Sequence, residues 1–99
     1  MSFDDLVRRG LDSLPREIAR GLENVAVVVE DENPDDPDLF GLYQGGDYGP
    51  DTVTIYCRPL EETFHDPLEL EREIRITVLH ELGHYFGLDE ERLAELGYD

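Results

Sequence analysis

Apolar positions recur at helical spacing in two parts of the chain. The first part begins at Ser2, which fits an N-cap with Asp5 as its capping-box partner, and Pro15 interrupts or restarts the helix. The second begins with Asp66-Pro67-Leu68-Glu69, where an N-cap carboxylate precedes proline at the first helical position. It predicts a helix over residues 67–86, about 30 Å long. The apolar stripe of this helix consists of Leu70, Ile74, Val78, Leu79, Leu82 and Phe86.

Three segments between these helices have the composition of strands. Residues 25–29 are nearly all apolar and β-branched, which suits a strand buried on both faces. Residues 39–44 predict a short strand in which Gly41 allows close approach by another backbone. Residues 52–58 alternate between apolar and polar side chains, a pattern typical of a half-buried strand. The acid- and proline-rich residues 31–38 predict an exposed loop between the first two strands.

Cys57 is the only cysteine, so no internal disulfide can form and nothing indicates secretion. In the alternating segment it shares a face with Val53 and Ile55. A catalytic thiol would need a histidine partner, and the two best candidates belong to the motif described below. We therefore interpret Cys57 as a core-packing residue.

Length and charge limit the classes of function. The 99 residues suffice for a single domain, expected to span residues 1–99. The net charge of −17 repels phosphate, which excludes nucleic acid as a partner. The acids are spread along the chain, which favours solubility or adaptation to salt or heat over a cleft that gathers cations and basic peptides. There is no apolar run of ~20 residues and no signal-peptide pattern, so we expect a cytoplasmic protein without membrane contact.

The strongest motif is His80-Glu81-Leu82-Gly83-His84, near the end of the second predicted helix. Two imidazoles four residues apart lie on the same helix face, one turn apart, and can bind one ion. A catalytic zinc site has three protein ligands and one open position for water. The motif therefore predicts His80 and His84 as zinc ligands, with Glu81 as the general base beside the bound water.

The third ligand is expected just after the helix. Gly87 suits a sharp turn, which would bring a following side chain back toward the ion. Glu90 occupies the third-ligand position of the extended pattern H-E-x-x-H-x-x-G-x-x-E. Asp89 is an alternative, although it is better explained as the N-cap of a last helix over about residues 90–96. Glu90 could instead serve only the dipole of that helix, in which case neither acid binds metal.

These motifs, together with further segments, resemble the small bacterial zincin-like metallopeptidase family, a minimal zincin. The matching segments, in chain order, are residues 3–7 with 14–15, 25–31, 39–45, 55–60 and 80–93. The resemblance implies an α+β fold, with a small mixed three-stranded sheet packed against an N-terminal helix and a long active-site helix, followed by a short C-terminal helix. It also implies zinc on His80 and His84 with Glu81 as the base. The third-ligand position of the family is usually acidic, as Glu90 is.

The sequence thus predicts a zinc-dependent metallopeptidase in which Glu81 activates water for attack on a peptide bond. A metal-stabilised binding or regulatory domain without turnover is the alternative. Few residues follow Glu90, so we expect a shallow cleft for short or extended peptides, unless a protein partner or homodimer completes it. The substrate is expected to lie along residues 39–44 as an edge strand. Tyr43, Tyr56 and Tyr85 are candidates for stabilising the oxyanion, with core packing favoured for each, and His65 is expected at the surface.

Overall fold

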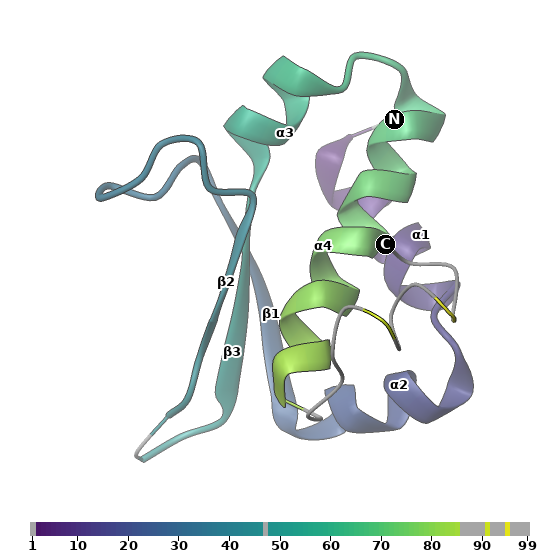
Figure 1. The fold of residues 1–99 in the computed structure, drawn as a ribbon, viewed down its shortest axis with the longest axis vertical. Coiled ribbons are helices and arrows are strands. Elements are labelled where there is room, and N and C mark those ends of the chain that lie inside the picture. Colours follow the sequence, from purple (N-terminus) through teal and green to yellow (C-terminus); the bar gives the residue numbers. More distant parts are fainter. Residues whose placement is uncertain (1, 47, 86–90, 92–94, 96–99) are drawn as a thin grey trace.

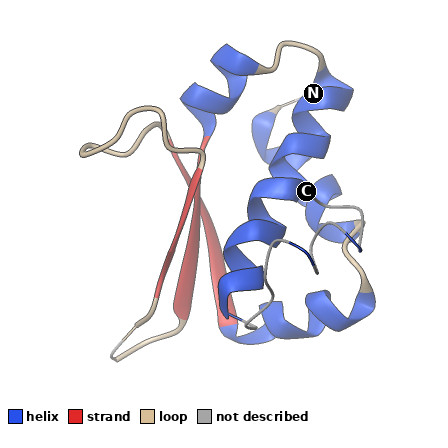
Figure 2. Cartoon of the chain, in the orientation of Figure 1, coloured by secondary structure: helices blue, strands red, loops and turns tan. Residues whose placement is uncertain are grey.

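The computed structural model describes residues 2–46, 48–85, 91 and 95 of the chain. Figure 1 shows the order of the elements, and Figure 2 distinguishes helices from strands. The elements are α1 (Phe3–Asp12), α2 (Arg16–Gly21), the 3₁₀ turn η1 (Leu22–Asn24), β1 (Val25–Glu30), β2 (Gly41–Gln44), β3 (Asp51–Tyr56), α3 (Cys57–Thr63) and α4 (Pro67–Tyr85). The short C-terminal helix expected over about residues 90–96 falls mostly outside the described residues.

The three strands form one mixed sheet in the order β1-β3-β2. β1 runs parallel to β3, and β2 runs antiparallel to it, so that Val53 of β3 lies between Val27 and Tyr43. The parallel pair is connected through the 31–40 loop and β2, and β2 forms an edge of the sheet. The α+β fold with a small mixed three-stranded sheet is therefore confirmed.

Helix α4 lies at the centre of the molecule, between the sheet and α1 (Figure 1). Its apolar stripe is buried as predicted for all members that the structure describes, and Ile74, Val78 and Leu82 have no exposed surface. On the sheet side this stripe belongs to one core with Val53 and Ile55. Burying such a side chain contributes about 1.5–3 kcal/mol, so this core holds α4 firmly against the sheet.

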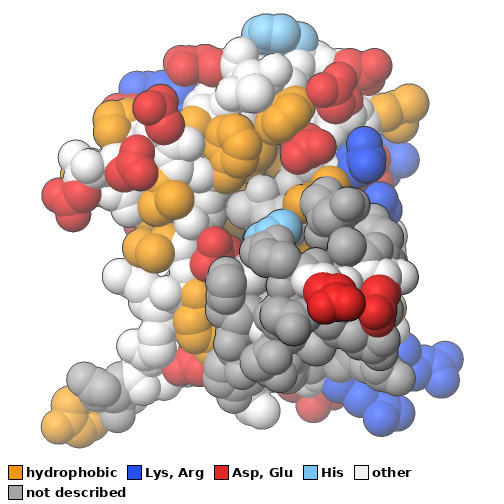
Figure 3. Space-filling view, viewed as in Figure 1, with side chains coloured by type: hydrophobic (Ala, Val, Ile, Leu, Met, Phe, Trp, Pro, Cys, Tyr) orange, Lys and Arg blue, Asp and Glu red, His pale blue; other side chains and the backbone are white. Residues whose placement is uncertain are grey.

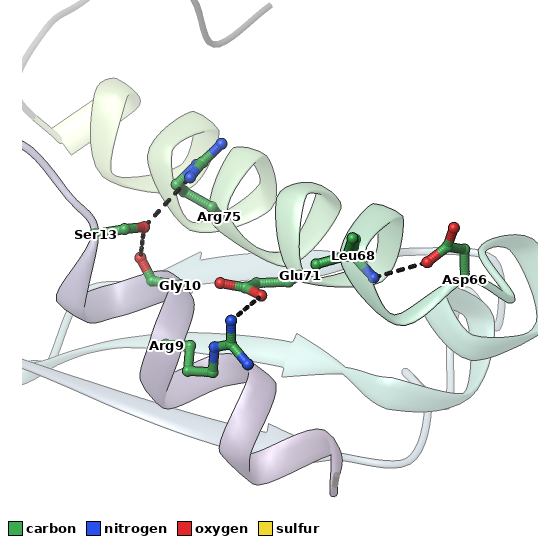
Figure 4. Close-up of polar contacts among 7 residues, drawn as sticks. All are labelled: Arg9, Gly10, Ser13, Asp66, Leu68, Glu71 and Arg75. Atoms are coloured by element: carbon green, nitrogen blue, oxygen red, sulfur yellow. Dashed lines mark hydrogen bonds and ion pairs between the residues drawn. The ribbon is translucent and has the colours of Figure 1, made fainter.

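The helix ends follow the predicted local signals. The Ser2 hydroxyl accepts a hydrogen bond from the Asp5 N–H at 3.2 Å, and the Asp5 carboxylate accepts one from the Ser2 N–H, which completes a capping box. At the start of α4 the Asp66 carboxylate accepts the Leu68 N–H at 2.9 Å (Figure 4). Pro15 separates α1 from α2.

Polar contacts supplement the packing of α1 on α4 (Figure 4). The Arg9 guanidinium lies 3.5 Å from the Glu71 carboxylate. Arg75 donates to the Ser13 hydroxyl at 3.4 Å, and that hydroxyl donates to the Gly10 carbonyl at 2.8 Å. Partly exposed pairs of this kind contribute about 0–1 kcal/mol. They therefore help to align the two helices, while the apolar core provides most of the stability.

Two predictions about the strands are wrong. Strand β1 is not buried on both faces, because the core covers only the face with Val25, Val27 and Val29, and Val28 on the other face is 39% exposed. The strand predicted over residues 52–58 ends at Tyr56, and Cys57 begins α3 as a half-buried residue. Pro59 explains this boundary, since proline cannot donate to a strand ladder but fits the first turn of a helix. Cys57 is therefore not on the buried face of β3.

Candidate active site

The motif His80–His84 lies within α4, in its last two turns. The backbone positions of His80 and His84 are therefore one helical turn apart, as the sequence predicted. His80 and Glu81 are half-buried. The side chain of His84 lies outside the described part of the chain, as do Asp89 and Glu90.

A cleft of about 440 Å³ runs along α4 next to the motif. One wall is the loop and strand segment over residues 36–41, and the other is the face of α4 that carries Glu73, Thr77 and His80. Volumes of this size are ordinary for small-molecule and peptide side-chain sites. The lining residues are Asp36, Asp38, Leu39, Phe40, Gly41, Glu73, Ile76, Thr77, His80 and Glu81.

Glu81 is bonded to the edge strand of the sheet. The backbone N–H of Tyr43 donates to its Oε2 at 3.0 Å. The Phe40 carbonyl accepts a hydrogen bond from the Tyr56 N–H, so the backbone polar groups of Phe40 point toward β3. In an antiparallel ladder this direction alternates, so the backbone polar groups of Gly41 and Tyr43 point away from β3. The outer edge of β2 thus meets α4 at Glu81.

The tyrosines predicted as oxyanion candidates do not line the cleft where the structure describes them. The Tyr43 hydroxyl donates to the Asp51 carboxylate, which also accepts the Gly46 N–H at 3.0 Å. These two hydrogen bonds, the one from Tyr43 first, lower the pKa of Asp51. Tyr56 is 3% exposed, and its hydroxyl accepts a hydrogen bond from Asn33 at 3.0 Å. Both tyrosines therefore have structural roles, and the Tyr85 side chain lies outside the described residues.

Four other polar residues of the cleft were not singled out from the sequence. Glu73 precedes His80 and Glu81 by two helical turns and Thr77 by one, so their spacing on the motif face was a usable signal. Asp36 and Asp38 come from the loop that was expected to be exposed, and both are exposed at the cleft rim. No sequence pattern indicates that this loop borders α4. His65 lies at the surface, as expected.

Among the residues described, no three His, Cys, Asp or Glu side chains gather at one point that could hold a metal ion. Two of the three predicted ligand side chains, those of His84 and Glu90, lie outside that set. The described residues fit a metal site. His80 lines the cleft, and α4 remains helical through His84, so the backbone positions of both histidines lie one turn apart on the same helix. The donor set expected there, two imidazoles and one carboxylate, is a common one for catalytic zinc.

The fold and the motif correspond to a known family. Residues 22–98, which include the whole sheet and α4, match the family described as zincin-like metallopeptidase. The chain therefore belongs to the zincin-like metallopeptidase family, and the resemblance seen in the sequence is confirmed.

One solved structure extends this likeness to nearly the whole chain. It is a conserved hypothetical protein from Thermo thermophilus, 25% identical, with a TM-score of 0.59. The similarity covers 98% of this chain and 96% of the other. No curated protein sequence matches the chain. None of the helices in the described ranges is both long and apolar enough to cross a bilayer.

Proposed function

We propose that the protein is a zinc-dependent metallopeptidase that hydrolyses short or extended peptides, with Glu81 as its general base. The observation that carries this proposal is the position of Glu81. Its carboxylate lies in a cleft beside His80, and it is bonded to the edge strand of the sheet. A base needs to be within hydrogen-bond reach of the proton that it removes, and the position of Glu81 in the cleft beside His80 supports this role.

His80, His84 and Glu90 are the residues that would hold zinc, with Asp89 as the alternative to Glu90. When bound, zinc makes water more acidic and polarises a carbonyl oxygen. Glu81 accepts the proton of the attacking water and passes it to the leaving amine. Proton transfer by a positioned side chain contributes about 100- to 10,000-fold in rate.

The substrate class follows from the edge strand. β2 has an outer edge next to the cleft, and an extended peptide lying there would present a backbone carbonyl near Glu81. A cleft of about 440 Å³ suits a short segment of peptide. A partner protein or a second copy of the chain would lengthen the binding surface and increase selectivity.

A peptide-library digest of the zinc-loaded protein, read by mass spectrometry, tests the proposal. Glu81→Gln keeps the size of the side chain but removes the base, so zinc should remain bound while turnover falls by at least about 100-fold. Glu69→Gln is the matched control, since Glu69 is an exposed residue in the first turn of the same helix. Undiminished hydrolysis by Glu81→Gln would contradict the assignment. Tight zinc binding without any hydrolysis by the wild-type protein would support the non-catalytic binding domain instead.

A further inference from the structure

Strand β2 approaches α4 unusually closely at Gly41. A Cβ atom added at this glycine would lie 2.6 Å from Cγ2 of Thr77 and 3.2 Å from the carbonyl oxygen of Thr54. It would also lie 3.6 Å from Cγ of Glu81. The first distance is far inside van der Waals contact, so any side chain at this position requires the Thr77 side chain, β2 or α4 to move.

Thr77 cannot easily give way. Its hydroxyl donates to the Glu73 carbonyl at 2.8 Å, and this bond fixes the rotamer that presents Cγ2 to Gly41. The residue is 9% exposed, so its methyl group has little free space to enter. Glycine at position 41 and the fixed methyl of Thr77 together set the distance between β2 and α4.

This distance determines whether β2 can reach Glu81. Tyr43 is two residues beyond Gly41, on the same side of the strand, and its N–H is the group that donates to Glu81 at 3.0 Å. A hydrogen bond to a carboxylate is short-ranged, so a shift of β2 by a fraction of an ångström weakens it. Loss of this bond removes one of the contacts that restrict the rotamers of the half-buried Glu81 side chain.

We propose that Gly41 is a positioning residue for the general base. By letting β2 lie directly against Thr77, it brings the Tyr43 N–H to Glu81 and thereby orients the carboxylate toward the reacting water. This inference rests on the proposed function, because it needs Glu81 to be the base. The donor is a backbone group, so the side chain of Tyr43 is not required for it.

Amide hydrogen exchange in the metal-free protein tests the hydrogen bond from Tyr43 to Glu81 without any activity assay. Gly41→Ala should speed exchange of the Tyr43 amide by at least about tenfold, the factor expected for a hydrogen bond to a charged group. The Tyr56 amide, which donates to Phe40 at 2.9 Å, is the internal reference for intact β2–β3 pairing. Gly45→Ala is the matched control, because an added Cβ there meets only Asp51 Oδ1, at 3.7 Å.

A second substitution tests the cause. Thr77→Ser in the Gly41→Ala background removes Cγ2 but keeps the hydroxyl, and it should restore most of the protection of Tyr43. Thr77→Val in the same background keeps a methyl group and should not restore it. If Gly41→Ala alone does not fold, Glu81→Ala in the wild-type background must still accelerate exchange at Tyr43. An unchanged Tyr43 amide in Glu81→Ala or in folded Gly41→Ala would overturn the proposal.

Kinetic constants then test whether the hydrogen bond from Tyr43 to Glu81 affects turnover. Gly41→Ala should lower kcat by about 10- to 100-fold, as expected for a catalytic group displaced by up to ~1 Å. KM and zinc affinity should stay near the wild-type values. Thr77→Ser in the Gly41→Ala background should recover most of kcat. If exchange at Tyr43 rises but kcat does not fall, the positioning role is wrong although the peptidase stands. If the wild-type protein hydrolyses no peptide, the proposed function fails and the positioning role with it, whereas the exchange data still report on the contact.

Discussion

At the scale of single residues, the environment of Cys57 makes a clear chemical prediction. Burial raises the pKa of its thiol, and the carboxylates of Glu61 and Asp31 raise it further. The reactive form of cysteine is the thiolate, so a raised pKa slows reaction at pH 8. Alkylation of the folded protein by iodoacetamide should therefore be slower than that of an unstructured cysteine peptide. Asp31→Asn should increase the rate, and a folded-state rate equal to that of the peptide would contradict the prediction.

Asn33 is the residue that shapes the loop before β2. It is 9% exposed, and its side-chain oxygen accepts the N–H groups of Asp35 at 2.8 Å and Asp36 at 3.0 Å, while its amide donates to Tyr56. Asn33→Ala leaves these groups without their partner and should lower the free energy of unfolding by about 1–3 kcal/mol. Tyr56→Phe removes only one of the three bonds and should cost less. Urea denaturation measures both, and an equal or larger loss in Tyr56→Phe would refute this account.

At the scale of elements, the Asp51 side chain at the start of β3 connects to the C-terminal end of β2 through hydrogen bonds. The hydrogen bonds from the Tyr43 hydroxyl and the Gly46 N–H lower the pKa of its carboxyl in the folded state. A depressed folded-state pKa contributes stability that is fully present above the unfolded value, ~3.9, and is lost as pH falls through the folded value. Asp51→Asn should therefore destabilise the protein at pH 7, and the difference from wild type should shrink as pH falls below about 4.

Unfolding measured by urea at a series of pH values checks this prediction. Tyr43→Phe is the informative control, because it removes the hydroxyl donor but keeps the backbone N–H that binds Glu81. The pH-dependent effect of Asp51→Asn on the free energy of unfolding should become smaller in the Tyr43→Phe background. Exchange at the backbone amide of residue 43 should stay slow. A pH-independent effect of Asp51→Asn would contradict the assigned cause.

The elements with local signals could be predicted from the sequence. Helices α1 and α4 carry both a capping residue and a helical apolar period, and both are present with nearly the expected ends. Helix α3 was not predicted, because the alternation of β3 continues into Cys57 and only Pro59 indicates the change. The exposure of one face of β1 depends on which face the core covers, and composition does not determine this.

The candidate site was predictable only in part. His80 and Glu81 line the cleft, and the i,i+4 motif places them on a helix from sequence alone. The contact from Tyr43 to Glu81 could not be predicted, since every residue except proline carries the same backbone N–H. The nearness of Asp36 and Asp38 to α4 likewise comes from tertiary packing. The roles of His84 and Glu90 stay predictions, because their side chains lie outside the described residues.

At the scale of the whole molecule, the net charge of −17 creates a negative electrostatic field, and the structure shows where acidic side chains lie close to the cleft. Acidic side chains are distributed over several parts of the face seen in Figure 3. Four carboxylates, those of Asp36, Asp38, Glu73 and Glu81, line the cleft, and no arginine is among its lining residues in the described part of the chain. A cleft lined by one sign of charge concentrates ligands of the opposite sign. The composition favoured a role in solubility, and the cleft adds a reason to expect selection of cationic peptides.

Peptides of equal length and different charge therefore provide the last prediction. At low ionic strength a cationic peptide should have a kcat/KM at least about tenfold above that of its anionic counterpart, the lower end of the range for electrostatic steering. The ratio should fall as salt rises, because the screening length shrinks from ~30 Å at 0.01 M to ~10 Å at 0.1 M. Asp36→Asn with Asp38→Asn should reduce the ratio more than Asp4→Asn with Asp12→Asn, since both pairs change the net charge equally but only the first lies at the cleft. Equal and salt-insensitive rates would assign the acidic surface to solubility alone.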